Sequence, residues 1–251
     1  MQPSPQPKVA LVTGAGKRRV GNVIATMLAG RGYQIALHYR SSAADAQDTM
    51  LRLRAQGIHA HAFQADVSNE ADVQRMFAEV MEQFGRLDVL VTAAAVWERK
   101  PLEEIRAEDV RRQFEINALG TFLCCQHAGL IMVRQPEGGA IVTIGDWAIA
   151  RPYPDYAAYF ASKGAIPTLS RAMAVELASR NPAVRVNCIL PGPVMLPEDL
   201  PEEERRSAIA GTLVRREGRP EHIGQAAIFL VENDFVNGVC LPVDGGRTIA
   251  G

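Results

Sequence analysis

The feature that most constrains the fold is the first strand, turn and helix of the chain. An apolar run, Lys8–Val12, ends in Thr13 and a glycine-rich turn that extends from Gly14 to Gly21. Apolar residues then recur at helical spacing through Ile24 and Ala29. Glycines let the backbone approach a pyrophosphate, and the helix N-terminus offers free N–H groups. A glycine-rich turn alone would be a weak signal, but this order of elements is typical of a dinucleotide phosphate site.

The same alternation of apolar runs and amphipathic segments continues to the end of the chain. It predicts a single-domain α/β protein with a Rossmann-type doubly wound parallel sheet of about seven strands. Residues 1–7 contain three prolines and are expected to form a flexible tail, and residues 8–251 the dinucleotide-binding domain. The charged, irregular stretch 194–219 is expected to be a substrate lid, with a plain surface loop as the alternative. Further strands are predicted at residues 33–38, 58–63, 87–91, 140–144, 184–190 and 239–243.

Composition argues against several classes of function. Lys plus Arg number 27 and Asp plus Glu 28, a net charge of -1, which gives no reason to expect nucleic acid or a membrane surface as partner. No apolar run is long enough to span a bilayer and no signal peptide is present, so a cytoplasmic location is expected. The cysteines and histidines lack metal-ligand spacing, so no metal is expected. Cys124 and Cys125 are expected to fill the core.

Basic residues at the end of the second predicted strand bear on the choice of cofactor. Arg40 and Ser41 follow that strand, and Arg18 lies in the glycine-rich turn. An acid after this strand would bind a free ribose 2′-hydroxyl, whereas an Arg suits a 2′-phosphate. The sequence therefore predicts NADPH rather than NADH, unless Arg40 is only a solvated loop residue. Small residues after the fourth strand, Ala93 and Ala94, either leave room for a flat cofactor or pack tightly.

Tyr159 and Lys163 stand four residues apart on one face of a predicted helix. A phenol titrates near roughly 10, and a nearby ammonium lowers that pKa, so the pair could act as a general acid and base. This pattern alone is weak, since a surface pair would look the same. Asp146 lies thirteen residues earlier, at the carboxyl end of a predicted strand, where open α/β sheets bind ligands.

Six motifs follow one another along the chain: Thr13-Gly14 with its glycine turn, Asp66-Val67, Asn117, Tyr159-x-x-x-Lys163, Pro191–Val194 and Val243–Gly246. In this order they resemble the short-chain dehydrogenase/reductase family over Val9–Gly246. The resemblance implies that Tyr159 donates a proton, and that Lys163 holds the nicotinamide ribose and lowers the tyrosine pKa. It implies that Asn117 supports a water chain to the lysine, although an Asn among apolar residues is more often exposed than functional. The implied cofactor contacts are Gly14, Gly16, Lys17, Arg18 and Gly21 at the pyrophosphate turn, Arg40 and Ser41 at the ribose, Asp66 and Val67 at the adenine, Ala93 and Ala94 beside the turn, and Lys163, Pro191, Gly192 and Val194 at the nicotinamide half.

Three departures from the family pattern carry information. Arg18 replaces a glycine in a turn that is one residue longer, Thr92–Ala95 replaces Asn-Asn-Ala-Gly, and Asp146 replaces the catalytic Ser. Arg18 and Asp146, together with His38–Ser41 and Trp97, resemble the pteridine reductase branch, in which an aromatic side chain stacks on the pterin. The longer turn and the missing Asn pair do not match that branch.

Asp146 is the departure with the clearest chemical consequence. A Ser hydroxyl can donate to the oxyanion of a ketone being reduced, whereas an ionised Asp can only accept and would repel it. Asp146 therefore favours reduction of the C=N bond of a pterin, unless burial keeps it protonated or the site is degraded. Trp97 is expected either to stack on a planar substrate or to pin its loop. The alternatives are a ketone reductase of the carbonyl or 3-oxoacyl type and a non-catalytic NADPH-binding sensor.

Two helices bear on assembly. Residues 117–133 and 159–180 are largely apolar on more than one face. By resemblance they pack against two-fold mates, and the segment 239–251 joins a second interface. A homotetramer is expected, with a dimer as the next choice.

Overall fold

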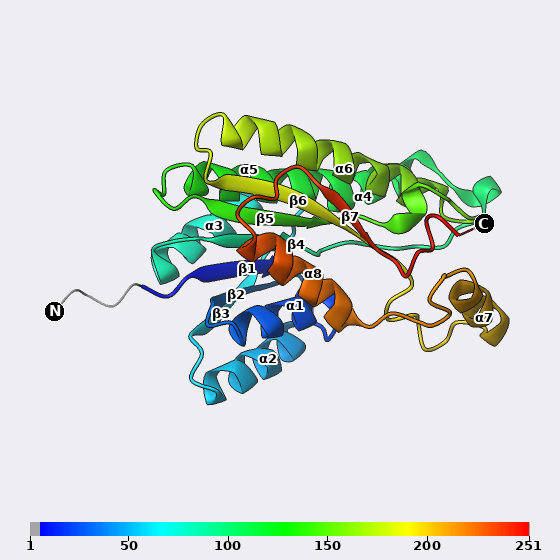
Figure 1. Ribbon diagram of the computed structural model, residues 1–251, viewed down its shortest axis with the longest axis horizontal. Helices are drawn as coiled ribbons and strands as arrows, with labels where there is room; N and C mark the ends of the chain where they lie inside the picture. The colour runs from blue at the N-terminus through cyan, green and yellow to red at the C-terminus, as the bar shows by residue number, and fades with distance from the viewer. Residues whose placement is uncertain (1–5, 251) are drawn as a thin grey trace.

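The computed structural model describes residues 6–250 (Figure 1). Seven strands form one sheet in the order β3-β2-β1-β4-β5-β6-β7. Every neighbouring pair is parallel, which confirms the predicted doubly wound sheet. The strands are Val9–Thr13 (β1), Gln34–Tyr39 (β2), Ala60–Gln64 (β3), Val89–Thr92 (β4), Gly139–Ile144 (β5), Val184–Pro191 (β6) and Cys240–Val243 (β7).

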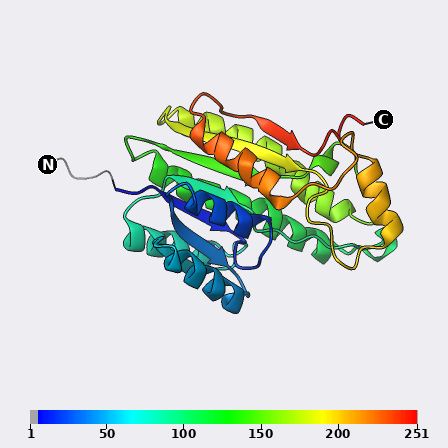
Figure 2. The ribbon, with the colours of Figure 1, turned by 60° about the horizontal axis from the view of Figure 1, so that its bottom comes forward.

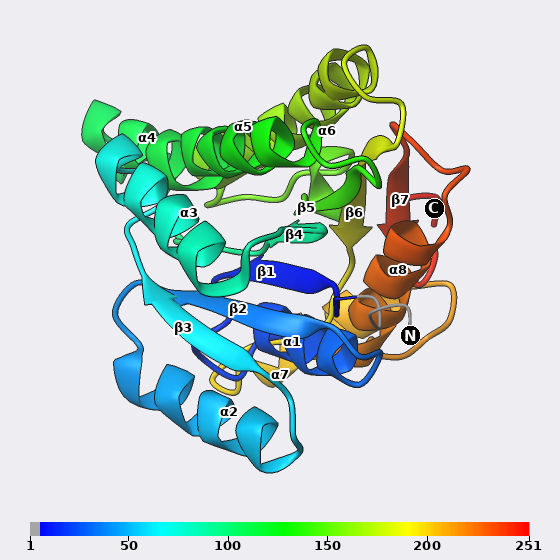
Figure 3. The same ribbon diagram turned by 90° about the vertical axis from the view of Figure 1, so that its left-hand side faces the viewer.

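Helices cover both faces of the sheet, with α3 to α6 on one side and α1, α2 and α8 on the other (Figure 3). Helix α7 lies away from both faces, at the carboxyl edge of the strands (Figures 1 and 2). The helices are Val20–Ala29 (α1), Ala43–Ala55 (α2), Glu70–Phe84 (α3), Ala107–Gln113 (α4), Gly120–Met132 (α5), Ala157–Ala178 (α6), Glu202–Ala210 (α7) and Pro220–Glu232 (α8), with short helical segments at Leu102–Glu104 (η1), Phe114–Leu119 (η2) and Trp147–Ile149 (η3).

Burial on both faces explains why the central strands are continuous apolar runs. All five residues of β1 are buried. Leu11 packs in the core cluster under α3, α5 and α6, and its neighbour Val12 packs in the cluster under α1, α2 and α8. The chain order reverses between β1 and β4, and the carboxyl ends of these strands are where such sheets usually have their ligand-binding crevice.

Two local features lie beside the crevice. The N-cap of α3 is Asn69, whose side chain accepts from the Asp72 N–H at 3.1 Å. The hydroxyl and the N–H of the preceding residue, Ser68, are both donated to Asp66. The π-helical segment η2, which contains Asn117, lies between α4 and α5. Such segments are frequent at functional sites.

The predicted tail and lid remain expectations. Residues 1–5 lie outside the described part, and the side chain of Gln6 donates to the Phe84 carbonyl at 3.2 Å. Residues 194–219 include α7, in which no residue is buried. No helix among residues 6–250 combines the length and the apolar character needed to cross a membrane.

Candidate active site

Helix α6 brings Tyr159 and Lys163 to the carboxyl end of β5. The Tyr159 hydroxyl donates to Oδ2 of Asp146 at 2.7 Å, and Nζ of Lys163 donates to the Ile144 carbonyl at 2.8 Å. Tyr159 is 6% exposed and Lys163 5%. The structure therefore brings together the three side chains that the sequence singled out for acid–base chemistry.

The pKa of Tyr159 differs from the expectation. Burial raises it well above its usual value, and the negative charge of Asp146 raises it further. The prediction that Lys163 lowers this pKa is wrong, because the phenol is hydrogen-bonded to a carboxylate and the ammonium to a carbonyl. Burial lowers the pKa of Lys163 itself. The Tyr159 phenol is therefore a protonated donor throughout the neutral range.

Asp146 uses both carboxylate oxygens. Oδ1 accepts from the Ala148 N–H at 2.8 Å, which caps η3, while Oδ2 accepts from Tyr159. Asp146 therefore both orients the tyrosine and caps the next segment. Burial raises its pKa. Two donors aimed at its two oxygens nevertheless match the ionised, acceptor-only form of the side chain.

Asn117 is buried, with 1% exposed, so the interpretation of it as an exposed polar residue is wrong. Its amide exchanges two hydrogen bonds with the Val96 backbone and donates to Ser162 at 2.9 Å. Ser162 in turn donates to the Tyr159 carbonyl. Asn117 thus links the loop after β4 to the helical turn that carries Tyr159.

The glycine-rich turn is locked against the end of β4. Gly14 has φ +64, and a Cβ there would lie 2.7 Å from Cα of Ala94, so only glycine fits without strain. The hydroxyl of Thr13 accepts the N–H groups of Ala93 and Ala94 at 3.0 and 3.1 Å. Ala93 and Ala94 therefore pack tightly, as one of the two interpretations proposed. A Cβ at Gly21 would also approach Ala93, at 3.1 Å.

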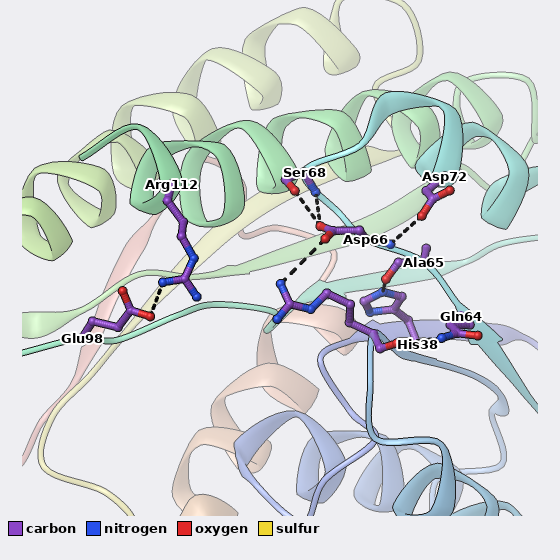
Figure 4. Close-up of polar contacts among 9 residues, drawn as sticks. His38, Gln64, Ala65, Asp66, Ser68, Asp72, Glu98 and Arg112 are labelled. Atoms are coloured by element: carbon purple, nitrogen blue, oxygen red, sulfur yellow. Dashed lines mark hydrogen bonds and ion pairs between the residues drawn. The ribbon is translucent and has the colours of Figure 1, made fainter. Parts of the chain in front are cut away.

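His38 holds the other side of this turn. Its Nδ1 accepts the Gly14 N–H at 3.0 Å, and its Nε2 lies 3.0 Å from the Ala65 carbonyl (Figure 4). The ring must therefore carry its proton on Nε2. Burial lowers the pKa of His38, which keeps this tautomer neutral.

The adenosine end of the crevice is exposed and basic. Lys17, Arg18, Arg40 and Ser41 are all exposed, and they follow β1 and β2. Helix α1 begins with no side-chain cap and no acidic residue in its first turn, so its N-terminal N–H groups can bind an anion. A Cβ at Gly16 would lie 2.2 Å from the Ser42 hydroxyl, which fixes the turn against the end of β2. These features fit the phosphate groups of a dinucleotide.

Asp66 closes the adenosine end (Figure 4). Its Oδ1 accepts from the hydroxyl of Ser68 at 2.6 Å, and Arg40 lies 3.7 Å from Oδ2. Although burial opposes the change, the hydrogen bonds from Ser68 and the charge of Arg40 lower the pKa of Asp66. The Asp66 N–H is donated to Asp72 at 3.0 Å, while Val67 packs in the core. The figure also shows Arg112 paired with Glu98.

At the nicotinamide end, Pro191 ends β6 and Gly192 follows, where a Cβ would lie 2.4 Å from Cα of Asp244. Val194 forms a single parallel bridge with Gly218, which fastens the two ends of the predicted lid to each other. A cavity of about 370 Å³ lies here. Tyr159, Lys163 and Asp146 do not line this cavity. Its lining is Gly192, Pro193, Val194, Thr212, Val214, Arg216, Gly218, His222, Gln225 and Pro242–Gly246.

Trp97 remains 44% exposed in the loop after β4. It stacks on Tyr156, with ring centroids 4.9 Å apart and planes 7° apart. One face of the indole therefore anchors the loop, which is one of the two roles considered for it. Next to it, Arg99 pairs with Glu204 of α7 at 3.4 Å, so this loop also contacts the predicted lid.

Sequence reasoning missed two residues that shape the site. Thr13 aligns the end of β4, and its place directly before Gly14 at a strand end was an available signal. Arg247 lies 4.6 Å above the Trp147 ring and donates to the Ala208 carbonyl of α7 at 2.6 Å. It thus joins the segment after Asp146 to the predicted lid. No local pattern marks Arg247, because its partners are distant in sequence.

Comparisons with known proteins agree with this geometry over nearly the whole chain. The family model described as enoyl-(acyl carrier protein) reductase matches residues 14–248. The human (Homo sapiens) 3-oxoacyl-[acyl-carrier-protein] reductase is 35% identical over 244 residues, 95% of this chain and 97% of that protein. The hydroxynaphthalene reductase-like protein of Metarhizium majus is 34% identical over 257 residues, 95% of this chain and 94% of that protein.

A solved structure gives the same result. The crystal structure of acetoin dehydrogenase from Enterobacter cloacae has a TM-score of 0.88 and 33% identity, covering 99% of this chain and 98% of that one. The fold, the tyrosine–lysine helix and these matches lead to one conclusion: the chain belongs to the short-chain dehydrogenase/reductase family, whose members are oxidoreductases that use a nicotinamide cofactor.

Proposed function

We propose that the protein is an NADPH-dependent reductase of a small planar substrate with a C=N bond, similar to a pterin. The observation that carries the proposal is the 2.7 Å hydrogen bond from Tyr159 to Asp146. A carboxylate that accepts from the proton donor cannot also donate to a developing oxyanion. It can hold the N–H groups of a heterocycle and keep the phenol aimed at a ring nitrogen.

The choice of NADPH rests on the exposed cations at the adenosine end. Arg40, Arg18 and Lys17 offer a charged surface for a 2′-phosphate, and Ser41 adds a hydroxyl. Gly14, Gly16 and Gly21 let the backbone approach the pyrophosphate, and Asp66 with Val67 faces the adenine. Arg40 must share its charge with Asp66, 3.7 Å away, and a bound phosphate would compete for it.

A bound nicotinamide cofactor would supply the hydride. Tyr159 gives its proton to the reduced atom, and its raised pKa ensures that the proton is present at neutral pH. Lys163 places an ammonium group beside the cofactor ribose. Asn117 keeps the Tyr159 turn and the Trp97 loop in register. Pro191, Gly192 and Val194 shape the wall beside the nicotinamide.

Trp97 is the side chain that we assign to the substrate. Its exposed face lies in the loop that follows β4, beside the crevice, so it can cover one face of a flat ring while the nicotinamide covers the other. The name of the Metarhizium relative, hydroxynaphthalene reductase-like, refers to a planar fused-ring compound, which supports a planar substrate here.

A second candidate is a ketone reductase. The names of the human 3-oxoacyl relative and of the acetoin dehydrogenase favour it, since both refer to carbonyl compounds. It requires Asp146 to be protonated so that the carboxyl can donate, and the raised pKa of this group supports that possibility. A cofactor-binding sensor without turnover is disfavoured, because the chain keeps Tyr159, Lys163 and Asn117 together, all three buried.

Assembly is also a proposal. Phe114, Leu119 and Phe122 expose apolar surface on η2 and α5, and Val175 does so on α6. These faces support a homotetramer, with a dimer as the next choice. Light scattering at micromolar concentration measures the oligomeric state. We also propose that the protein is cytoplasmic.

The decisive experiment measures oxidation of NADPH and of NADH with a matched panel of pterins, quinones and 3-oxoacyl thioesters. We expect NADPH with a pterin to give the highest kcat/KM. A clear preference for NADH would refute the cofactor assignment. Turnover of 3-oxoacyl thioesters alone would refute the C=N assignment and favour the ketone reductase. Binding of NADPH without turnover of any compound on the panel would favour the cofactor-binding sensor.

A further inference from the structure

Two cysteines that the proposed chemistry does not use lie opposite each other in the sheet. Cys188 on β6 is the register partner of Cys240 on β7. Register partners on neighbouring parallel strands project to the same face and lie about 4.8 Å apart at Cα. That separation falls within the range of roughly 4.4–6.8 Å found for disulfides. Each thiol is close enough to the other to shift its pKa.

The two thiols differ in access and in electrostatic surroundings. Cys188 is fully buried, and Cys240 on the edge strand is partly exposed. The neighbouring Cys240 thiol and burial raise the pKa of Cys188. Although burial opposes the change, the neighbouring Cys188 thiol and the charge of Arg171 on α6 lower the pKa of Cys240. Cys240 is therefore the nucleophilic partner, and Cys188 is the second thiol next to it.

Cys188 also lies directly beneath the active site. A Cβ at Gly145, the residue before Asp146, would lie 3.2 Å from its sulfur atom. Lys163 is close enough for the charge of a Cys188 thiolate to affect its pKa. Any covalent change at Cys188 therefore occurs under the strand end that carries Asp146.

We propose that Cys240 and Cys188 form a peroxide-reactive dithiol that closes to a disulfide between β7 and β6. The Cys240 thiolate attacks one oxygen of hydrogen peroxide and the O–O bond breaks, giving a sulfenic acid and, with one proton, water. The Cys188 thiol then attacks that sulfur, the S–O bond breaks, and the second oxygen leaves as water with the released proton. Two thiols are oxidised, one peroxide is reduced, and a thiol reductant reverses the reaction.

Peptide mapping of the full-length protein tests this directly. After peroxide, free thiols are blocked by alkylation and the chain is cut with trypsin without reduction. Cleavage after Arg185, Arg205, Arg216 and Arg247 isolates Cys188 in residues 186–205 and Cys240 in residues 217–247, because the bond between Arg219 and Pro220 resists trypsin. We expect these two peptides to appear joined, with the loss of two hydrogen atoms, and to separate on reduction.

The chain supplies its own controls. Cys124 and Cys125 are buried neighbours in one peptide, residues 113–134, and should stay fully alkylated. Cys188→Ser should leave a Cys240 sulfenic acid that dimedone traps, and Cys240→Ser should abolish the joined peptide even if Cys188→Ser folds poorly. Arg171→Gln should slow the reaction about threefold through a smaller thiolate fraction, whereas Arg180→Gln beyond the same helix should not. Four unreacted thiols after peroxide, or a bond within residues 113–134, would overturn the proposal.

Discussion

The two ends of the crevice, which we propose bind the adenosine half and the nicotinamide half of the cofactor, are built in opposite ways. At the adenosine end, Lys17, Arg18 and Arg40 are exposed, and the one ion pair there, Arg40 with Asp66, spans 3.7 Å. At the nicotinamide end, Tyr159 and Lys163 are buried, and the hydrogen bonds from Tyr159 to Asp146 and from Lys163 to Ile144 are 2.7 and 2.8 Å long.

This difference indicates where the protein can tolerate change. Exposed charges interact weakly with each other through water, so a substitution at the adenosine end removes one contact and leaves the rest intact. A buried network cannot lose a member without leaving a polar group unpaired, so a substitution at the nicotinamide end affects its neighbours as well. Cofactor preference should therefore be easier to alter than the chemistry.

The largest effect is expected from Tyr159→Phe, which removes the proposed proton donor and keeps the ring. We expect kcat to fall by about 10²–10⁴-fold, with little change in cofactor affinity measured by fluorescence. Tyr156→Phe is the matched control, because its hydroxyl does not contact Asp146. Equal losses in the two variants would show that Tyr159 acts only through packing.

Asp146→Ser should change both substrate preference and pH dependence. The hydroxyl can donate to an oxyanion, so the ratio of ketone to pterin activity should rise by about tenfold or more. Asp146 raises the pKa of Tyr159 by its charge and its hydrogen bond. Without it this pKa falls, the phenol loses its proton at lower pH, and the alkaline decline of the reduction rate moves to lower pH. An unchanged ratio and an unchanged profile would mean that the carboxylate does not select the substrate.

Arg40→Gln tests the opposite end of the crevice. Loss of a charged hydrogen bond to the 2′-phosphate should raise the KM for NADPH by about 10–100-fold and leave the KM for NADH unchanged. Arg52→Gln is the matched control, since Arg52 is equally exposed but pairs with Asp48 on α2. If kcat for the pterin falls together with cofactor affinity, the two ends are less independent than the structure indicates.

The smallest effect is expected from Trp97→Ala. A stack is worth about 0.5–1.5 kcal/mol beyond area burial, so the KM for the planar substrate should rise about two- to tenfold with kcat nearly constant. Trp97→Phe should restore most of the affinity. Tyr156→Ala removes the partner that holds the indole in place, and if it reproduces the whole effect, then Trp97 serves only to anchor the loop.

Sequence patterns predicted the sheet because its determinants are local. The apolar runs of β1 and β4 and the glycine turn between β1 and α1 can be read without knowledge of their partners. The conjunction of Tyr159, Lys163 and Asp146 followed from spacing and family resemblance, and the structure places all three together. For Asn117, the family resemblance predicted a place in the site, whereas its apolar neighbours suggested an exposed residue. The structure shows that Asn117 is buried.

Features that depend on distant partners could not be predicted. The direction of the Tyr159 pKa shift depends on which group its hydroxyl contacts, and helical spacing from Lys163 does not reveal Asp146 as that group. The cation–π contact of Arg247 with the Trp147 ring joins residues that are 100 positions apart in the sequence.

His38 also gives the turn a natural spectroscopic reporter. Its ring is almost fully buried, its Nδ1 accepts the Gly14 N–H, and its Nε2 proton is donated to Ala65. An imidazole proton held in this way exchanges slowly with solvent and should give a resolved resonance in an NMR spectrum. The chemical shifts of that proton and of the Gly14 amide would follow any opening of the glycine-rich turn, so that ligand binding at the pyrophosphate position could be observed without adding a label to the site.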